Sequence, residues 1–339
     1  MPKKMIEDHS RRRFLYQGSL AAAAMFSGVK YAQAASHVFH RAAAKPNSLI
    51  KGVQVGAITY SFRSLPGSTD QLLQYLIDAN ISAIELMGDA VEEYAGAPKN
   101  PIKWVPGRKN DLTDAEKAQA KAYQQQLAAW RENAPLDKFK EVRSQYNKAG
   151  VHIYAFKPNA LNPSNTDGEI EYALKAAKTL GARSVTVELP EDPAHSKRLG
   201  ALAEKQGIFI GYHAHTQATD TAWDIALSQS PFNSMNLDCG HYIAAGGANT
   251  KDTLLALIEA KHDRITSMHI KDRKNKANGG NNFPWGQGDT PIKEILTLLK
   301  NKKYAIPATI ELEYDVPAGS DAVKETHKCR DFAQAALES

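Results

Sequence analysis

Short apolar runs alternate with longer segments of helical periodicity along most of the chain. Eight runs have the length and composition of buried strands, and each lies between turn or helix signals. Most of them begin about 25 to 40 residues apart, which is the length of one strand–helix unit. They are 53–61, 83–87, 152–156, 184–189, 209–213, 235–238, 265–270 and 309–313.

The segments between these runs carry the end signals of amphipathic helices. Ser68 and Thr113 each begin a capping box. Glycines at 150, 181 and 207 stand where a helix ends and the next strand begins. Helices are predicted over 167–180, 193–206, 250–262 and 291–299.

Eight strand–helix units without a break predict an α/β fold, a (β/α)8 TIM barrel forming a single domain over 50–339. An open doubly wound sheet is disfavoured, because the first strand leads into Tyr60-Ser61-Phe62-Arg63 and not into a Gly-rich phosphate turn. The gap between strands 2 and 3 is longer than the others. It predicts an inserted helical segment with an extra helix over 113–130, after a Pro- and Trp-bearing stretch at 98–106. We expect this insertion to form a lid or a subunit contact.

The first 34 residues have the layout of an export signal. A basic stretch ending in Ser10-Arg11-Arg12-Arg13-Phe14-Leu15 precedes a mildly apolar stretch to Val29 and a small-residue site at Ala32-Gln33-Ala34. The paired arginines, and Lys30 before the cleavage site, favour the twin-arginine route over the Sec route. The alternative is a chance basic N-terminus before a short apolar helix. Residues 1–34 are therefore predicted to be a twin-arginine signal peptide, and the protein to be periplasmic.

Removing this leader changes the charge argument. The whole chain has a net charge of +5, and the leader holds six basic and two acidic residues, so the mature protein is close to +1. A nucleic-acid partner is disfavoured, because a folded nucleic-acid binder keeps a strong basic excess. After the leader, no stretch is long and apolar enough for a membrane anchor. Cys239 and Cys329 are interpreted as unpaired, with a disulfide as the less favoured alternative.

Polar residues close four of the predicted strands. Glu188, Asp238, His269 and Glu311 each end or follow an apolar run, and the carboxyl ends of barrel strands meet at the active face. Each residue alone is as well explained as a cap, a rim ion pair or a packed histidine. Together, three carboxylates and an imidazole would repel one another unless a divalent cation joined them. Oxygen-rich ligands with one histidine suit Mn²⁺, with Mg²⁺ or Co²⁺ as alternatives.

The strand motifs V-T-V-E-L-P, G-Y-H-A-H, N-L-D-C-G-H, S-M-H-I-K-D, G-Q-G-D and I-E-L-E resemble the sugar phosphate isomerase/epimerase family. These are xylose-isomerase-like TIM barrels that include ketose 3-epimerases and inosose dehydratases. The resemblance extends from residue 53 to about 314. It implies that Glu188, Asp238, His269 and Glu311 hold the metal, with Glu313 as the alternative to Glu311. It also implies that His241 faces the substrate, and it favours a homo-dimer or tetramer.

A metal held by these groups would stabilise an enediolate formed from a hydroxy-ketone. Glu188 and Glu311 are the predicted catalytic acid and base, one on each face of the sugar. Returning the proton to the same carbon gives epimerisation, and returning it to the neighbouring carbon gives isomerisation. Loss of a β-substituent gives elimination, and addition of water to that product gives hydration.

Further side chains are candidates for substrate contact. His213 and His215 are two apart on one strand, and one of them is equally well explained as a packed core histidine. A lone loop tryptophan such as Trp285 is as often a packing residue as a platform for a sugar ring. The remaining candidates are Lys157 and Lys271, with Tyr60 and Glu85 expected on the rim.

The sequence therefore predicts a metal-dependent isomerase or epimerase acting on a non-phosphorylated keto-sugar. Phosphorylated substrates are disfavoured by the compartment and by the lack of a Gly-rich or multi-Arg cradle. The alternative is a periplasmic lyase, hydratase or hydrolase that cleaves 3-keto-glycosides by the same α-proton chemistry. An AP-endonuclease-like nuclease and a non-catalytic sugar-binding protein are the less favoured hypotheses.

Overall fold

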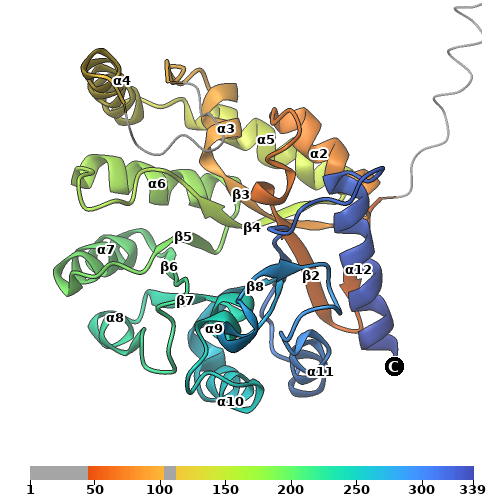
Figure 1. Ribbon diagram of the computed structural model, residues 1–339. Coiled ribbons are helices and arrows are strands. Elements are labelled where there is room, and N and C mark those ends of the chain that lie inside the picture. Colours follow the sequence, from red (N-terminus) through yellow and green to blue (C-terminus); the bar gives the residue numbers. More distant parts are fainter. Residues whose placement is uncertain (1–44, 103–111) are drawn as a thin grey trace, which may run out of the picture. The chain divides into compact units, whose positions relative to one another are not determined.

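The computed structural model describes residues 45–102 and 112–339. The predicted signal peptide at 1–34 lies outside the described residues, as does part of the 98–106 stretch. Eight parallel strands close into a barrel, because β2 pairs with both β3 and β11 (Figure 1). They are β2 (Val53–Ile58), β3 (Ala83–Met87), β4 (His152–Lys157), β5 (Ser184–Glu188), β6 (Phe209–His213), β7 (Asn233–Asp238), β8 (Ile265–Ile270) and β11 (Ala308–Ile310). The predicted (β/α)8 architecture is confirmed.

Helices form the outer ring of the barrel (Figure 1). Their apolar faces pack on the outside of the strands in one continuous hydrophobic core. They are α2 (Thr69–Asp78), α3 (Gly88–Tyr94), α4 (Asp114–Glu132), α5 (Leu136–Ala149), α6 (Asp167–Leu180), α7 (Pro193–Gln206), α8 (Asp224–Gln229), α9 (Cys239–Ala245), α10 (Lys251–Lys261), α11 (Ile292–Lys302) and α12 (Ala322–Glu338).

The end signals in the sequence act as expected. Ser68 and Thr113 form capping boxes at the starts of α2 and α4. Gly150, Gly181 and Gly207 end α5, α6 and α7 in the left-handed conformation, which a residue without a Cβ adopts at little cost. Among the described residues, no helix is long and apolar enough to cross a membrane.

The first and last barrel strands are shorter than the apolar runs that predict them. β2 ends at Ile58, and a 3-10 helix, Thr59–Phe62, follows. The Ser61 hydroxyl donates to the Ile310 carbonyl and accepts from the Leu312 amide. This side chain takes the place of the ladder bonds that a longer strand would make, so Glu311 and Glu313 lie beyond the end of β11.

Among the described residues, three helices lie between β3 and β4: α3, α4 and α5. Of the 19 residues of α4, only Leu127 and Arg131 are buried. The Arg131 guanidinium lies between two buried carboxylates, 3.4 Å from Glu92 of α3 and 3.0 Å from Glu169 of α6. A buried ion network therefore holds α4 against α3 and α6, together with the apolar packing of Leu127 and of the half-buried Trp130, whose ring meets Tyr172 edge-on.

Short antiparallel pairs complete the structure. β1 (Leu49–Ile50) pairs with β2, and β9 (Asp272–Arg273) pairs with β10 (Asn282–Phe283) in the loop that follows β8. Two further 3-10 helices, His262–Arg264 and Lys276–Asn278, lie on either side of β8 in sequence. Cys239 and Cys329 are both buried and unpaired, as predicted.

Candidate active site

A cavity of about 220 Å³ opens at the carboxyl ends of the barrel strands. One part of its wall is formed by Ile58, Tyr60 and Met87. The rest is polar and comprises Lys157, Glu188, His213, His215, His241, Glu311 and Glu313. Most of the predicted site residues therefore surround one space, at the face where TIM barrels carry their chemistry.

Asp238 is the last residue of β7 and also caps the helix that follows. Its Oδ1 accepts a 2.7 Å hydrogen bond from the His241 amide, which starts α9. Its Oδ2 is fully buried and receives no hydrogen bond. This oxygen is surrounded at 3.8–3.9 Å by ring nitrogens of His213, His241 and His269. The capping role needs only one of the two carboxylate oxygens, so the other can face a cation, and Lys271 Nζ lies 3.0 Å from it in this structure.

His213, at the end of β6, presents a lone pair to that free oxygen. Its Nδ1 lies 2.9 Å from the Asn236 side-chain oxygen, which can only accept, so Nδ1 carries the ring proton. Burial lowers the pKa of His213 to about 4, which keeps the ring neutral. The unprotonated Nε2 then faces Asp238 Oδ2 at 3.9 Å. Nε2 of His213 and Oδ2 of Asp238 are thus both buried acceptors, and neither carries a proton that could join them in a hydrogen bond.

His269 is held between two carboxylates. Its Nε2 lies 2.9 Å from Glu85 and its Nδ1 lies 3.0 Å from Glu311. Burial opposes protonation of this ring, but the two carboxylates outweigh burial and raise its pKa to about 10. Glu85 is fully buried and also accepts from Thr186 and Asn236, so it lies beneath the cavity and not on the rim where the sequence placed it.

Lys271 lies at the centre of the carboxylates. Its Nζ is 3.0 Å from Asp238 Oδ2, 2.5 Å from Glu311 Oε2 and 2.8 Å from Glu313 Oε2. Burial opposes its charge, but the three carboxylates raise its pKa above the ordinary lysine value. Burial would raise the pKa of Glu311, but the charges of Lys271 and His269 outweigh it and hold that pKa well below the ordinary carboxyl value.

Glu188 points to a different set of partners. One carboxylate oxygen lies 3.0 Å from Lys157 Nζ and the other lies 3.1 Å from His215 Nε2. Burial alone would raise the pKa of Glu188. The hydrogen bond with His215 and the charge of Lys157 outweigh burial, so the pKa lies below the ordinary carboxyl value. The structure thus brings Asp238, His269 and Glu311 into one cluster, and it places Glu188 on the wall of the same cavity.

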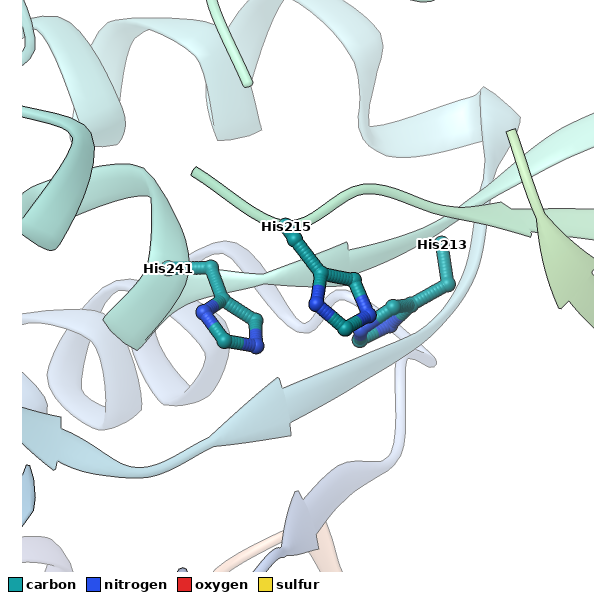
Figure 2. A group of neighbouring side chains, drawn as sticks. All are labelled: His213, His215 and His241. Atoms are coloured by element: carbon teal, nitrogen blue, oxygen red, sulfur yellow. The ribbon is translucent and has the colours of Figure 1, made fainter. Parts of the chain in front are cut away.

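Three imidazoles lie side by side at the cavity (Figure 2): His213 ends β6, His215 follows in the next loop, and His241 belongs to α9. The rings of His215 and His241 are stacked, with centroids 4.5 Å apart. His213 meets both rings edge-on. On the far side of His241, Nδ1 contacts the Arg273 guanidinium. These contacts fix the orientation of His241, and the sequence analysis did not identify Arg273 as part of the site.

Trp285 has a packing position. Its side chain is buried, and its ring meets Phe332 of α12 edge-on, with centroids 5.9 Å apart. It is not among the residues that line the cavity. Its loop is fixed by Asp272, whose carboxylate accepts from the amides of Gly286, Gly288 and Thr290. Trp285 therefore stabilises the loop after β8 and is not a platform for a sugar ring in this structure.

The geometry and the sequence agree with one family. Residues 112–331 match the family described as Xylose isomerase-like TIM barrel. The chain belongs to this family. A search of curated proteins found no match.

Solved structures share the barrel of the xylose isomerase-like family at low sequence identity. A sugar phosphate isomerase/epimerase from Parabacteroides distasonis is 18% identical, with a TM-score of 0.52 over 88% of this chain and 99% of that one. D-Psicose 3-epimerase from Clostridium cellulolyticum is 12% identical, with a TM-score of 0.57 over 85% and 100%. A probable 3-DHS dehydratase from Bacillus anthracis is 13% identical, with a TM-score of 0.54 over 84% and 98%. At these identities the likeness concerns the fold.

Members of the xylose isomerase-like family typically depend on a divalent metal ion. The donor set of this chain fits such an ion. Ligand atoms of His213, Asp238 and His269 lie within 4.8 Å of one another. A divalent cation would suit Asp238 Oδ2, which receives no hydrogen bond and has Lys271 as its charged neighbour, together with the facing lone pair of His213. The sequence analysis proposed His213 only as a substrate contact, because its spacing cannot show where Nε2 points.

Proposed function

We propose that this protein is a divalent-metal-dependent enzyme that moves the α-proton of a non-phosphorylated keto-sugar, as an isomerase or epimerase. One observation carries the proposal. Two ionised carboxylates, Glu188 and Glu311, reach one small cavity, and a buried cluster of metal-ligand type lies beside them. Epimerase, isomerase and dehydratase neighbours on the same fold support this reaction class.

The metal would be held by Asp238, His269 and Glu311, with His213 and Glu188 as further donors within the same face of the barrel. Mn²⁺ is the favoured ion, with Mg²⁺ or Co²⁺ as alternatives, because the set combines carboxylates with imidazole. When bound, the ion supplies the Lewis acidity that makes the α-proton of a ketone removable. Glu85 accepts a hydrogen bond from Nε2 of His269, which fixes the ring orientation and leaves Nδ1 toward the cluster.

The two carboxylates take opposite roles in the proposal. Glu311 is held in its ionised form by Lys271 and His269, which both contact Oε2, so its other oxygen, Oε1, is the one that can accept the α-proton. Glu188 shares a proton with His215, whose Nε2 lies 3.1 Å from its Oε2. The pair of Glu188 and His215 can therefore return a proton to the substrate while Glu311 holds the one that was removed.

The walls of the cavity favour an uncharged sugar. Lys157 is paired with Glu188, and Lys271 is paired with three carboxylates, so neither ammonium is available for a phosphate. Among the described residues, no arginine lines the cavity. Tyr60, Ile58 and Met87 provide an apolar surface opposite in character to the histidines, which suits one face of a sugar ring.

Export to the periplasm by the twin-arginine route is part of the proposal. It rests on the arginine motif at 10–15 and the small-residue site at 32–34. A periplasmic location supports free keto-sugars over sugar phosphates as substrates.

The test is α-proton exchange in D₂O, followed by NMR across free keto-sugars and 3-keto-glycosides with Mn²⁺ present. We expect Glu188→Gln and Glu311→Gln to slow exchange by about 10²–10⁴-fold, the usual contribution of a general acid or base. Glu191→Gln is the matched control, since Glu191 is exposed three residues after Glu188, in the loop that follows β5, and does not line the cavity. Exchange by Glu188→Gln at the parent rate would refute the acid–base assignment. Release of an aglycone in place of a rearranged sugar would show that the lyase or hydrolase alternative is right.

A further inference from the structure

Lys271 has more carboxylate partners than one ammonium needs. It is 2% exposed, and its Nζ lies within 3.0 Å of Asp238, Glu311 and Glu313. Two of these carboxylates, Asp238 and Glu311, are also the acidic members of the proposed metal cluster. The lysine charge and a metal ion therefore compete for the same two oxygens.

The chain makes room for this lysine at a specific position. A Cβ on Gly240 would lie 2.3 Å from Lys271 Cγ and 2.7 Å from the Lys271 carbonyl oxygen. Gly240 lies in the first turn of α9, between Asp238 and His241, and its backbone has no left-handed conformation to explain the glycine. The glycine is explained by the passage of the Lys271 side chain toward the carboxylates.

The contact of Lys271 with His241 shows that its position is a compromise. The Nδ1 of His241 accepts from the Arg273 guanidinium, which can only donate. A neutral ring then carries its proton on Nε2, and this atom lies 3.1 Å from Lys271 Nζ. Two donors face each other there, which is unfavourable. The attraction of the carboxylates therefore keeps the lysine in this position despite its contact with the histidine.

We propose that Lys271 is a built-in counter-ion that a divalent metal replaces: in the metal-free protein it holds Asp238, Glu311 and Glu313 together, and on metal binding it gives up the first two and stays on Glu313. This inference rests on the metal site of the proposed function. It also assigns the two glutamates of I-E-L-E, with Glu311 toward the metal and Glu313 as the lasting partner of the lysine.

The exchange has a physical reason. An ammonium about 3 Å from the oxygens that would bind a dication repels that dication strongly in a buried site. Without the lysine, the buried carboxylates of Asp238 and Glu311 and the half-buried carboxylate of Glu313 would repel one another whenever no metal is bound. The lysine thus stabilises the metal-free fold and weakens metal affinity at the same time.

The experiment compares the parent protein with Lys271→Met in two measurements. The first is the unfolding midpoint in EDTA, and the second is Mn²⁺ affinity by titration calorimetry. We expect Lys271→Met to unfold at a lower temperature than the parent in EDTA, to bind Mn²⁺ at least about tenfold more tightly, and to regain its stability when Mn²⁺ is added. Lys274→Met is the control, since Lys274 pairs with Asp289 in the same loop, away from the cluster.

A second variant keeps the proposal testable if Lys271→Met does not fold. Glu313→Gln removes the carboxylate that would still pair with Lys271 once the metal has taken Asp238 and Glu311. We therefore expect about tenfold weaker Mn²⁺ binding, with little change of the unfolding midpoint in EDTA. In the Lys271→Met background the same change should have little effect on Mn²⁺ affinity, because that variant has no lysine charge that Glu313 would need to neutralise. Equal effects of Glu313→Gln in both backgrounds would contradict the exchange.

The outcomes separate this inference from the proposed function. Mn²⁺ binding by the parent with no tighter binding by Lys271→Met overturns the exchange alone and leaves the metal-dependent function standing. Absence of Mn²⁺ binding in both proteins overturns the exchange together with the metal site. Tight binding by Lys271→Met and none by the parent supports the lysine as the competing cation and contradicts a metal-dependent reaction in the parent.

Discussion

Replacing Arg131 by methionine should detach helix α4 while the barrel stays folded. Arg131 is 2% exposed and contacts Glu92 and Glu169, which are each 5% exposed. Removal of one partner from a buried ion network leaves charges uncompensated and costs about 3–5 kcal/mol. Leu127, the other buried residue of α4, contributes only about 1.5–3 kcal/mol by burial. The half-buried Trp130 also packs on Tyr172, so the lost contact is comparable to the apolar packing that remains to hold the helix.

Hydrogen exchange measured by mass spectrometry tests this local effect. A loss of 3–5 kcal/mol corresponds to exchange that is faster by about a hundred- to several-thousand-fold, up to the limit of an undocked helix. We expect this increase over residues 114–132 and no comparable change in β5 to β8. Arg198→Met is the control, because Arg198 makes a partly exposed ion pair with Asp167 of the kind that contributes 0–1 kcal/mol.

A triple variant separates charge from packing. Arg131→Met combined with Glu92→Gln and Glu169→Gln removes the stranded charges, and glutamine keeps the capping-box acceptor for Thr166. We expect it to recover most of the protection of α4. If α4 exchanges as fast in the triple variant as in Arg131→Met, stranded charge is not the cause. If α4 keeps its protection in Arg131→Met, the network does not hold the helix.

Two further predictions concern packing and acid stability. Gly240→Ala places a Cβ against Lys271 and should lower the free energy of unfolding by about 1–3 kcal/mol in urea titrations. Gly67→Ala, which meets no atom within 4 Å, is its control, and equal midpoints for the two variants would contradict the close approach. Burial opposes ionisation of Glu325, but bonds from Lys328, Ser320 and Tyr314 outweigh it and lower its pKa. Its stabilisation is therefore present at neutral pH and is lost as the pH falls below about 4.3 through the lowered value. The free energy of unfolding of Glu325→Gln should depend less on pH over that range than that of the parent. Parallel plots of this free energy against pH for variant and parent would refute the prediction.

The fold was largely predictable because its signals are local. Alternation of apolar runs with capped, glycine-terminated helices specifies strand–helix units, and eight of them in succession close only as a barrel. The strand ends were less predictable. The sequence predicts the last strand over 309–313, but β11 stops at Ile310, because Ser61 from a distant segment takes over the backbone bonds beyond it.

The candidate site was predictable as a set of strand-end residues and not as a set of contacts. Barrel topology dictates that Glu188, Asp238, His269 and Glu311 face one end of the molecule. Which of them touch depends on side-chain directions and on competing partners elsewhere in the chain. Lys157 and His215 hold Glu188 apart from the other three, and Lys271 enters the centre of the cluster.

By itself, the sequence determined the barrel, the face that carries the chemistry and the residue types gathered there, because each of these follows from periodicity and chain order. Only the tertiary structure decided what those residues do to one another. Oδ2 of Asp238 has no hydrogen bond, His213 turns a lone pair toward it, and Glu85 lies buried beneath His269. These are distances between side chains on different strands, and no spacing along one strand encodes them.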